Sequence, residues 1–451
     1  MGIRAVISTQ TPLVRFRASM EDILIKYGES DCIDVESMDP EDYQKSPGGV
    51  TAMVGPMVAS LMRSGEFSTV RWVSFNPSAP PCFRYGGIEN HSVYMTSDKV
   101  PLYTNFKESL WNEIHGISRM KLDKGEYEAF ASFNWLTAER LMQFLTEVDL
   151  YWVHDFQLML VSNMIGPSAP VVYQWHIPFV PSLMQPLMAR FILKNMETAD
   201  SLIVSTRREM EGLTRLGSHG RAFQLYPWID ESQHVVPPGA VEEALAKYGL
   251  EGKEIMLLVA RMDPIKRQDV AIQAFAKVAK ERRNLVLVLV GNGSFTSSGL
   301  GHSKGAAWRS KLMGMVRELG LEDRVKMLGF VDDKRLAALY EASRLVILPS
   351  QLEGFGITTL EAWIHGKPVI VSSGAGSSEL VVNGVNGFVF RANDVEDLAG
   401  KMMDALKMDV DSMGKNGRQI AMMNTMDKAM NRLKDIFKET IESSSLGSGG
   451  Q

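Results

Sequence analysis

Short apolar runs alternate with amphipathic segments along the second half of the chain. The apolar runs cover residues 255–259, 285–290, 325–328, 345–348 and 369–372. Between them, apolar residues recur at helical spacing around 269–280, 309–319, 334–342 and 358–365. Short runs that are apolar on both faces are typical of buried parallel strands. Their alternation with helices predicts a parallel, doubly wound α/β sheet.

The first half shows the same pattern less regularly. Strands are predicted at 4–8, 70–75, 150–153, 171–175 and 201–205, and helices at 52–62 and 125–146. His154 and Asp155 directly follow one of these strands, and His176 follows the next. Because the carboxyl ends of parallel strands face the ligand crevice of an open sheet, these side chains are candidates for a binding site. The alternative is that each histidine is a buried structural residue.

The length of the chain predicts two domains, because 451 residues are too many for one ordinary core. Irregular, proline-rich sequence at 226–251 is the predicted linker. We expect Rossmann-like domains at 1–235 and 236–415, a helical segment at 416–442 and a disordered tail at 443–451. Whether the helical segment returns to the first domain stays open. The last long helix, about 395–442, is expected to break near Gly414 and Gly417, and 294–307 to form a loop.

The composition indicates which classes of partner are unexpected and in which cellular compartment the protein is expected. Hydrophobic residues make up 45% and charged residues 22%, and the net charge of −5 comes without a basic block. A nucleic acid is therefore not an expected partner. The sequence shows neither a signal peptide nor an apolar stretch long enough to span a membrane. Two cysteines, Cys32 and Cys82, imply no disulfide framework and fit a reducing compartment, so we expect a cytoplasmic protein.

The stretch 351–366, QLEGFGITTLEAWIHG, contains the strongest candidate for a ligand-binding motif in the sequence. Gly354 and Gly356, between a predicted strand and a predicted helix, allow a ligand to approach the backbone. Free N–H groups of the first helical turn would face an anion there. Glu353 and Glu361 flank the turn, and a sugar nucleotide offers phosphates for the amides and hydroxyls for the acids. The alternative is that Glu353 is a loop acid and Glu361 a partner of the helix dipole.

A second pair of charges follows the predicted strand 255–259. Arg261 and Lys266 lie five positions apart at its ligand end. A guanidinium can clamp two phosphate oxygens, and an ammonium adds a compact charge, so the pair suits a diphosphate. Together they could neutralise a leaving diphosphate without a metal. Solvated surface charge is the alternative.

Other motifs are weaker. Gly48 and Gly49 open a helix and allow backbone amides to touch a phosphate or sugar, although such a pair is usually a turn. Gly291-Asn292-Gly293 lacks the third glycine of a dinucleotide site. We interpret 409–411, an Asp-x-Asp sequence, as a solvated helix face. No Cys/His cluster has metal-ligand spacing, so we predict no metal and no cofactor besides the donor substrate.

Together these motifs resemble those of retaining glycosyltransferases with the GT-B fold. The pair Glu353 and Glu361, with Gly-Phe-Gly inside it, is similar to the donor site of glycosyltransferase family four. Arg261-x4-Lys266 is similar to the donor motif of GT-B retaining enzymes. The first half is similar to trehalose-6-phosphate synthases, and the likeness covers most of 48–390. The similar pieces, in matching order, are 72–76, 110–111, 133–134, 152–160 and 176–179.

The resemblance implies two Rossmann-like domains that face a central cleft, and an NDP-sugar-dependent retaining hexosyltransferase without a covalent nucleophile. It implies that the donor is bound by Gly48, Gly49, Arg261, Lys266, Phe330, Glu353, Gly354, Phe355, Gly356, Thr358, Thr359, Leu360 and Glu361. It implies that the acceptor is bound by Trp111, His154, Asp155 and His176. The catalytic set would be His154, Arg261, Lys266 and Glu353, acting by orientation and charge stabilisation. Its partners would be a sugar nucleotide and a sugar acceptor, with no nucleic acid or membrane, and a homo-oligomer stays open.

Two departures bear on the acceptor. The chain has 7–10, Ile-Ser-Thr-Gln, where the synthases show Ser-Asn-Arg, and 115–117, His-Gly-Ile, where they show His-Tyr-Arg. Two groups expected around a phosphorylated acceptor are therefore missing, and Arg15, Arg17 and Arg84 are candidate substitutes. The donor turn is also family-four-like rather than the Asp-Gly-Met-Asn of those synthases.

We therefore expect transfer of glucose from an NDP-glucose to glucose-6-phosphate or glucose, which forms trehalose-6-phosphate or trehalose. The alternatives are another small acceptor, such as glycerol phosphate, glycerate or another polyol, and a sugar phosphorylase or epimerase on the same fold. A non-catalytic sensor of sugar nucleotides is a further alternative. The sequence leaves the base of the donor nucleotide open.

Overall fold

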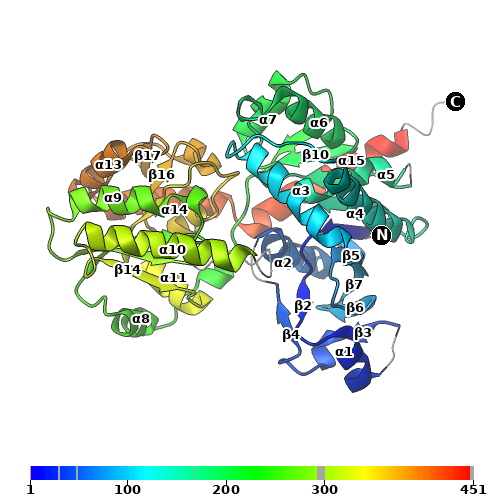
Figure 1. Cartoon of the computed structure of the whole chain (residues 1–451), viewed down its shortest axis with the longest axis horizontal. Helices are drawn as coiled ribbons and strands as arrows, with labels where there is room; N and C mark the ends of the chain where they lie inside the picture. The colour runs from blue at the N-terminus through cyan, green and yellow to red at the C-terminus, as the bar shows by residue number, and fades with distance from the viewer. Residues whose placement is uncertain (1, 29–30, 47–48, 167, 292–299, 447–451) are drawn as a thin grey trace. The chain divides into compact units, whose positions relative to one another are not determined.

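The computed structural model describes residues 2–28, 31–46, 49–166, 168–291 and 300–446. The chain forms two compact units (Figure 1). Unit 1 comprises Met1–Leu225 and Met430–Gln451, and unit 2 comprises Tyr226–Ala429. The C-terminal segment thus belongs to the same unit as the N-terminal half.

Unit 1 is an α/β unit. Its strands are β1 (Ile3–Thr9), β2 (Val14–Phe16), β3 (Ile33–Asp34), β4 (Tyr43–Lys45), β5 (Phe67–Phe75), β6 (Cys82–Tyr85), β7 (Ile88–Val93), β8 (Leu150–His154), β9 (Val171–Gln174), β10 (Ser201–Val204) and β11 (Ala222–Gln224). Its helices are α1 (Met20–Tyr27), α2 (Gly49–Arg63), α3 (Lys99–Ile114), α4 (Lys124–Met142), α5 (Val161–Met164), α6 (Pro186–Met196), α7 (Arg207–Arg215) and most of α15 (Met426–Leu446). Short 3₁₀ helices are η1 (Val35–Ser37), η2 (Phe156–Leu158) and η3 (Pro181–Leu183).

The main sheet of unit 1 has the order β11-β10-β9-β8-β1-β5-β7-β6-β3. Its neighbouring strands are parallel except for β6 and β7. Alternate residues of β8 face opposite sides, as strand geometry requires. Tyr151 and Val153 belong to the core beneath α3 and α4, whereas the Trp152 ring lies 5.2 Å from Phe437 of α15. The last helix therefore covers the second face of this sheet.

Unit 2 is built from regular strand–helix repeats. Its strands are β12 (Glu254–Val259), β13 (Leu285–Val290), β14 (Val325–Gly329), β15 (Ser343–Leu348), β16 (Val369–Ser372) and β17 (Gly387–Phe390). Its helices are α8 (Ala240–Tyr248), α9 (Gln268–Val278), α10 (Leu300–Glu318), α11 (Asp333–Ala342), α12 (Thr358–Ile364), α13 (Val395–Lys407) and α14 (Val410–Met423). The 3₁₀ helices are η4 (Glu231–His234), η5 (Pro264–Lys266) and η6 (Gly376–Leu380).

The sheet of unit 2 has the order β14-β13-β12-β15-β16-β17 and is parallel throughout. Leu258 and Leu289 face a core formed with α9, α10 and α13, and Leu257 and Val288 face one formed with α11, α12 and α14. Helices thus cover both faces, and the predicted doubly wound sheet is confirmed. The strand order reverses between β12 and β15, and such a switch point is where open α/β sheets bind ligands.

Several local predictions were wrong. The predicted linker contains η4 and α8, α10 already begins at Leu300, and a small lobe of β2, α1, β3 and β4 occupies a segment without predicted elements. Residues 294–299 of the predicted loop, and 447–451 of the predicted tail, lie outside the described residues, whereas 443–446 of that tail are part of α15. Among the described residues, no helix combines the length and the apolar character needed to cross a membrane.

The predicted helix break at Gly414 and Gly417 was also wrong, because both glycines lie inside α14. A Cβ at Gly414 would lie 1.7 Å from the carbonyl oxygen of Gly366, and one at Gly417 would lie 2.1 Å from the Trp363 ring. These glycines allow α14 to approach α12 closely. The chain turns instead near Asp409 and Asn424, between consecutive helices.

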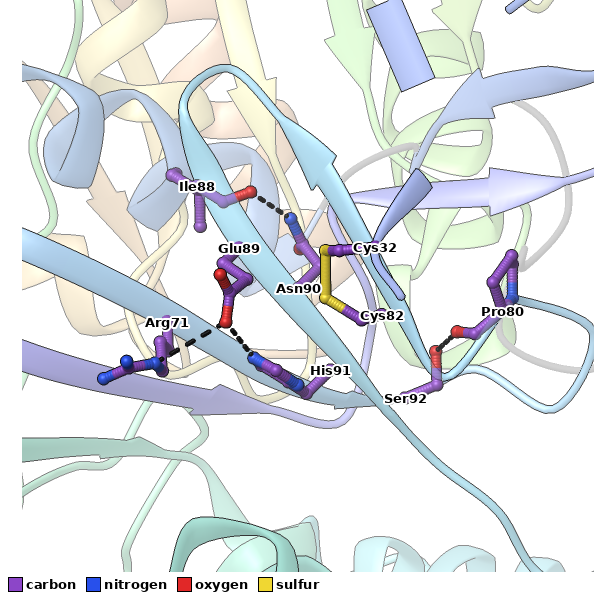
Figure 2. Close-up of a disulfide and its surroundings, with 9 residues drawn as sticks. All are labelled: Cys32, Arg71, Pro80, Cys82, Ile88, Glu89, Asn90, His91 and Ser92. Carbon is purple, nitrogen blue, oxygen red and sulfur yellow. Dashed lines mark hydrogen bonds and ion pairs between the residues drawn. A yellow bond between two sulfur atoms is a disulfide. The ribbon is translucent and has the colours of Figure 1, made fainter. Parts of the chain in front are cut away.

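The prediction that the cysteines form no disulfide was wrong. Cys32 and Cys82 are bonded to each other, 50 positions apart in sequence. The pairing of Ile33 with Phe83 places the starts of β3 and β6 side by side, which the cysteine count could not reveal. Figure 2 shows the disulfide beside Glu89, whose carboxylate contacts His91.

We predict that reduction of this disulfide destabilises unit 1. Closing a loop of this length removes about 4 kcal/mol of chain entropy from the unfolded state, and measured effects are commonly about 2–4 kcal/mol. A dithiol reductant should lower the Tm of the wild type and leave the Tm of Cys32→Ser/Cys82→Ser, already lower, unchanged. Equal Tm values for oxidised wild type and double variant would contradict the prediction.

We predict that Gly417→Ala costs about 1–3 kcal/mol of unfolding free energy, since its methyl group has no space beside Trp363. The matched control is Gly400→Ala in α13, where no heavy atom lies within 4 Å of the new Cβ. That control should gain about 0.4–1 kcal/mol. Denaturant unfolding of both variants measures the difference, and similar effects in the two would argue against close packing of α14.

Candidate functional site

The two motifs predicted from sequence meet at the switch point of unit 2. Arg261 follows β12, and Lys266 ends η5 directly after it. The backbone N–H of Gln351, just after β15, donates to the carbonyl oxygen of Ile265 at 2.8 Å. The Lys266 ammonium then reaches the Glu353 carboxylate, with 2.5 Å between Nζ and Oε1. The cationic turn and the acidic turn are therefore in direct contact.

Glu353 is held as a carboxylate. Burial by itself raises its pKa, but the charge and hydrogen bond of Lys266, the nearby Ser350 hydroxyl and the charge of Arg261 outweigh that effect, so its pKa lies below the usual value. Lys266 occupies Oε1, whereas Oε2 is buried and has no hydrogen-bond partner among the described residues. A buried carboxylate oxygen without a donor is costly. This oxygen is suited to accept a hydroxyl of a ligand.

The turn that carries Glu353 is held by a segment that the sequence reasoning missed. Backbone hydrogen bonds join Glu353 to Gly374 and Gly376, both at 3.1 Å, and Phe355 to Ser377 at 2.8 Å. A Cβ at Gly374 would lie 1.9 Å from a backbone oxygen, so only glycine allows this approach. The signal in the sequence was the small-residue run 373–378 after a strand.

The backbone amides of the predicted anion site are partly engaged. Gly356 has a φ of 96°, which favours glycine. The N–H of Thr359 donates to Gly356, and that of Glu361 donates to Ile357, both at 3.0 Å. The first turn of α12 therefore offers fewer free N–H groups than the sequence suggested. Of the remaining predicted donor residues here, Gly354, Phe355, Thr358, Thr359 and Leu360 are buried.

Glu361 has different surroundings from Glu353. Its Oε2 accepts a hydrogen bond of 2.7 Å from the hydroxyl of Tyr340, on α11. Burial raises its pKa, and the hydrogen bond from Tyr340 lowers it in part. No described cation forms an ion pair with it. The two acids are thus eight positions apart in sequence but have partners of different chemistry.

A hydrogen-bonded chain also supports Arg261. The indole N–H of Trp308 donates to Gln268 Oε1 at 2.9 Å, and Gln268 Nε2 donates to the carbonyl oxygen of Arg261 at 2.7 Å. Gln268 is fully buried, so this contact fixes the backbone that presents the guanidinium. Nothing in the local sequence around either residue indicated the contact.

Unit 1 brings its predicted histidines together at the carboxyl ends of β8 and β9. His154 Nδ1 lies 3.0 Å from His176 Nε2, and the two rings are stacked. Burial lowers the pKa of His176 to about 3 and that of His154 well below its usual value, so both imidazoles are neutral. One must donate its proton to the other, because each ring contributes one nitrogen to the contact. His154 Nε2 is buried and has no partner among the described residues.

Asp155, which directly follows His154, is buried and contacts the backbone of His176. It has a φ of 70°, which is unusual for a residue with a side chain, and its Oδ1 accepts from the backbone N–H of His176 at 3.4 Å. Burial raises its pKa to about 7. Such strained backbone occurs preferentially at functional sites.

The remaining predicted residues are dispersed. Trp111 of α3 stacks on His115, with 3.9 Å between ring centroids. Phe330 follows β14, and 67% of it is exposed. Gly49 is the first residue of α2, and Gly48 lies outside the described residues.

Two groups bear on metal binding. Among the described residues, Cys32, Cys82 and Glu89 have ligand atoms within 4.8 Å of one another, but both sulfurs are used by the disulfide. Asp409, from the Asp-x-Asp sequence, caps α14 by accepting from the N–H groups of Asp411 and Ser412.

Comparison with known proteins finds two segments of the chain that match glycosyltransferase families. Residues 241–420 match the family model for glycosyl transferases group 1, and residues 85–208 match the model for glycosyltransferase family 20. A D-inositol 3-phosphate glycosyltransferase from Mycolicibacterium smegmatis is 32% identical over 213 residues, which cover 47% of this chain and 46% of that protein. One from Rhodococcus erythropolis is 32% identical, covering 45% of each. The chain spans about half the length of these curated relatives.

Solved structures match the whole chain. The sucrose-phosphate synthase of Thermosynechococcus elongatus is similar with a TM-score of 0.71 at 18% identity, covering 98% of this chain and 100% of that one. The α,α-trehalose 6-phosphate synthase of Burkholderia multivorans gives 0.74 at 18% identity, covering 100% and 99%. At this identity the likeness shows the fold. The predicted GT-B fold and the resemblance to glycosyltransferases are confirmed.

A histidine pair, with His365 buried and His234 half-buried, lies next to Tyr340. The Tyr340 ring stacks on His365, whose Nε2 lies 3.2 Å from Nδ1 of His234. Burial lowers the pKa of His234 to about 4 and lowers that of His365 as well. Charged groups that act on the pair are Asp230 and Glu341, which favour protonation, and Lys367 and Arg418, which oppose it.

We predict that this pair makes the fold sensitive to acid. In the unfolded chain His234 becomes protonated below about pH 6.5, whereas in the folded chain its pKa is about 4. Between these two values the unfolded state binds more protons than the folded state, so the free energy of unfolding falls as the pH decreases. His234→Asn should show a smaller decrease in Tm between pH 7 and pH 4.5 than the wild type. Identical slopes in the two proteins would contradict the prediction, whatever their absolute Tm.

Proposed function

We propose that this chain, which carries segments of two glycosyltransferase families on a GT-B fold, is an NDP-glucose-dependent retaining glucosyltransferase with a small acceptor. The observation that carries the proposal is the contact between Lys266 and Glu353 at the switch point of unit 2, with Arg261 beside it. In this proposal the two cations bind the diphosphate of the activated sugar, and Glu353 binds its glucose.

In the proposed reaction, Arg261 and Lys266 hold the diphosphate, and Glu353 accepts hydroxyls of the glucose through its unpartnered oxygen. The bond between the anomeric carbon and the diphosphate oxygen breaks, and a bond to the acceptor oxygen forms on the same face. The leaving phosphate takes the proton of the acceptor hydroxyl, so the products are a glycoside and a nucleoside diphosphate. Positive charge near the leaving group stabilises the charge that develops there.

His154 is proposed to contact the transferred glucose. A neutral imidazole can exchange a hydrogen bond with a hydroxyl, and its Nε2 has no partner among the described residues. His176 then fixes which nitrogen of His154 carries the proton. The remaining predicted acceptor residues, Trp111 and Asp155, stay a prediction.

Two classes of acceptor are proposed. Glucose-6-phosphate or glucose is favoured by the family 20 segment and by structural neighbours named trehalose-6-phosphate synthase. A phosphorylated polyol is the second candidate, because the curated relatives are named for D-inositol 3-phosphate. Both classes are small and rich in hydroxyls.

We predict glycoside formation in an assay that combines UDP-, ADP- or GDP-glucose with glucose, glucose-6-phosphate, glycerol phosphate, glycerate or inositol phosphate. Release of nucleoside diphosphate should require an acceptor, and the product should keep the α configuration. A requirement for inorganic phosphate would instead indicate a phosphorylase. If every combination yields neither glycoside nor nucleoside diphosphate, the proposed function is wrong.

We predict that Lys266→Ala lowers kcat/KM for the donor by about 10²-fold or more, the range found when one stabilising group is removed from a developing charge. The matched control is Lys277→Ala. Lys277 lies on α9 and forms an ion pair of similar length, with 2.8 Å between its Nζ and Oε1 of Glu396. The control should keep wild-type kinetics. A Lys266→Ala enzyme within about twofold of the wild type would rule out the assigned role.

A further inference from the structure

We propose that Tyr340 is a positioning residue that orients Glu361 toward the ribose hydroxyls of the donor nucleotide. The inference rests on the proposed function and goes beyond it, because Tyr340 belongs to none of the motifs found in the sequence. The residue acts through Glu361 and needs no contact with the substrate.

The contact between the two side chains is short and shielded. The Tyr340 hydroxyl donates to Glu361 Oε2 at 2.7 Å, and Tyr340 is only 1% exposed. Among the described residues, no other group hydrogen-bonds to this carboxylate, so the Tyr340 hydroxyl is the directional contact that orients it. The hydroxyl occupies Oε2 and leaves Oε1 as the oxygen that a ligand hydroxyl can reach.

The ring of Tyr340 is packed against a neighbouring ring. It stacks on His365 with 5.4 Å between centroids and 6° between ring planes. His365 is itself held between Glu341, at 3.3 Å, and His234, at 3.2 Å. α11 and α12 therefore present the tyrosine and the glutamate as one fixed pair.

The chemistry of the pair suits recognition of a diol. A cation beside Glu361 would compete with ribose for the carboxylate, whereas a single hydroxyl donor leaves acceptor capacity for two further hydroxyls. The same hydrogen bond lowers the pKa of a carboxyl that burial raises, which keeps it ionised and accepting. Removing the hydroxyl frees the rotation of Glu361 and also favours its protonation.

The test is Tyr340→Phe, measured by calorimetric binding of UDP, ADP and GDP and of their 2′,3′-dideoxy forms. For the base that the wild type binds, the variant should lose about 10- to 150-fold in affinity for the ribonucleotide, as expected for a hydrogen bond to a charged group. It should lose less than twofold for the dideoxynucleotide, which offers no hydroxyl to Glu361. A purely structural role would weaken both ligands equally.

The matched control is Tyr103→Phe, which removes a buried tyrosine hydroxyl from unit 1 that has no hydrogen-bond partner among the described residues. It should leave both affinities unchanged. A loss of affinity in Tyr340→Phe that is the same for both ligands overturns the inference, as does a wild type that does not distinguish them. A wild type that binds no nucleoside diphosphate overturns the proposed function as well, so the two failures are distinguishable.

Discussion

The ion pair between Lys266 and Glu353 is the contact on which the candidate site depends. The sheet order brings β12 and β15 together at the switch point, so the turns after these strands become neighbours although they lie far apart in sequence. A largely buried pair of this kind is weak evidence for stability, since desolvation offsets much of the attraction. Its contribution to the proposed site would be preorganisation, because both charges are already desolvated and oriented without a ligand.

The two units handle ionisable groups in contrasting ways. In unit 2, opposite charges keep Glu353 ionised despite its burial. In unit 1, burial keeps His154 and His176 neutral, and it raises the pKa of the neighbouring Asp155 to about 7. The first arrangement suits a diphosphate and the hydroxyls of a sugar, and the second suits a neutral polar group. In the proposed enzyme, charged groups of unit 2 would thus bind the donor, and neutral polar groups of unit 1 would bind the acceptor.

Close backbone approaches decide the geometry around the donor turn. Gly374 lies against Gln351, and Gly414 and Gly417 of α14 lie against Gly366 and Trp363. Each contact is closed to a residue with a Cβ, so small residues set how α12, its preceding turn and their neighbours pack. The position of Glu361 on α12 therefore depends on residues outside the two charged motifs.

The sequence by itself determined ten of the strands, the doubly wound class and the two charged motifs, because periodicity and local composition report burial on each element and the order of elements limits topology. It missed short strands such as β2, β3 and β4, which are too short to show a clear period. It misjudged Gly414 and Gly417, since a glycine inside a helix looks the same whether it breaks the helix or permits close packing. It also missed the Cys32–Cys82 disulfide and the contact from Tyr340 to Glu361. Those depend on which distant segments become neighbours, and only the tertiary structure decided that, because burial and partner identity are properties of the folded chain rather than of a local pattern.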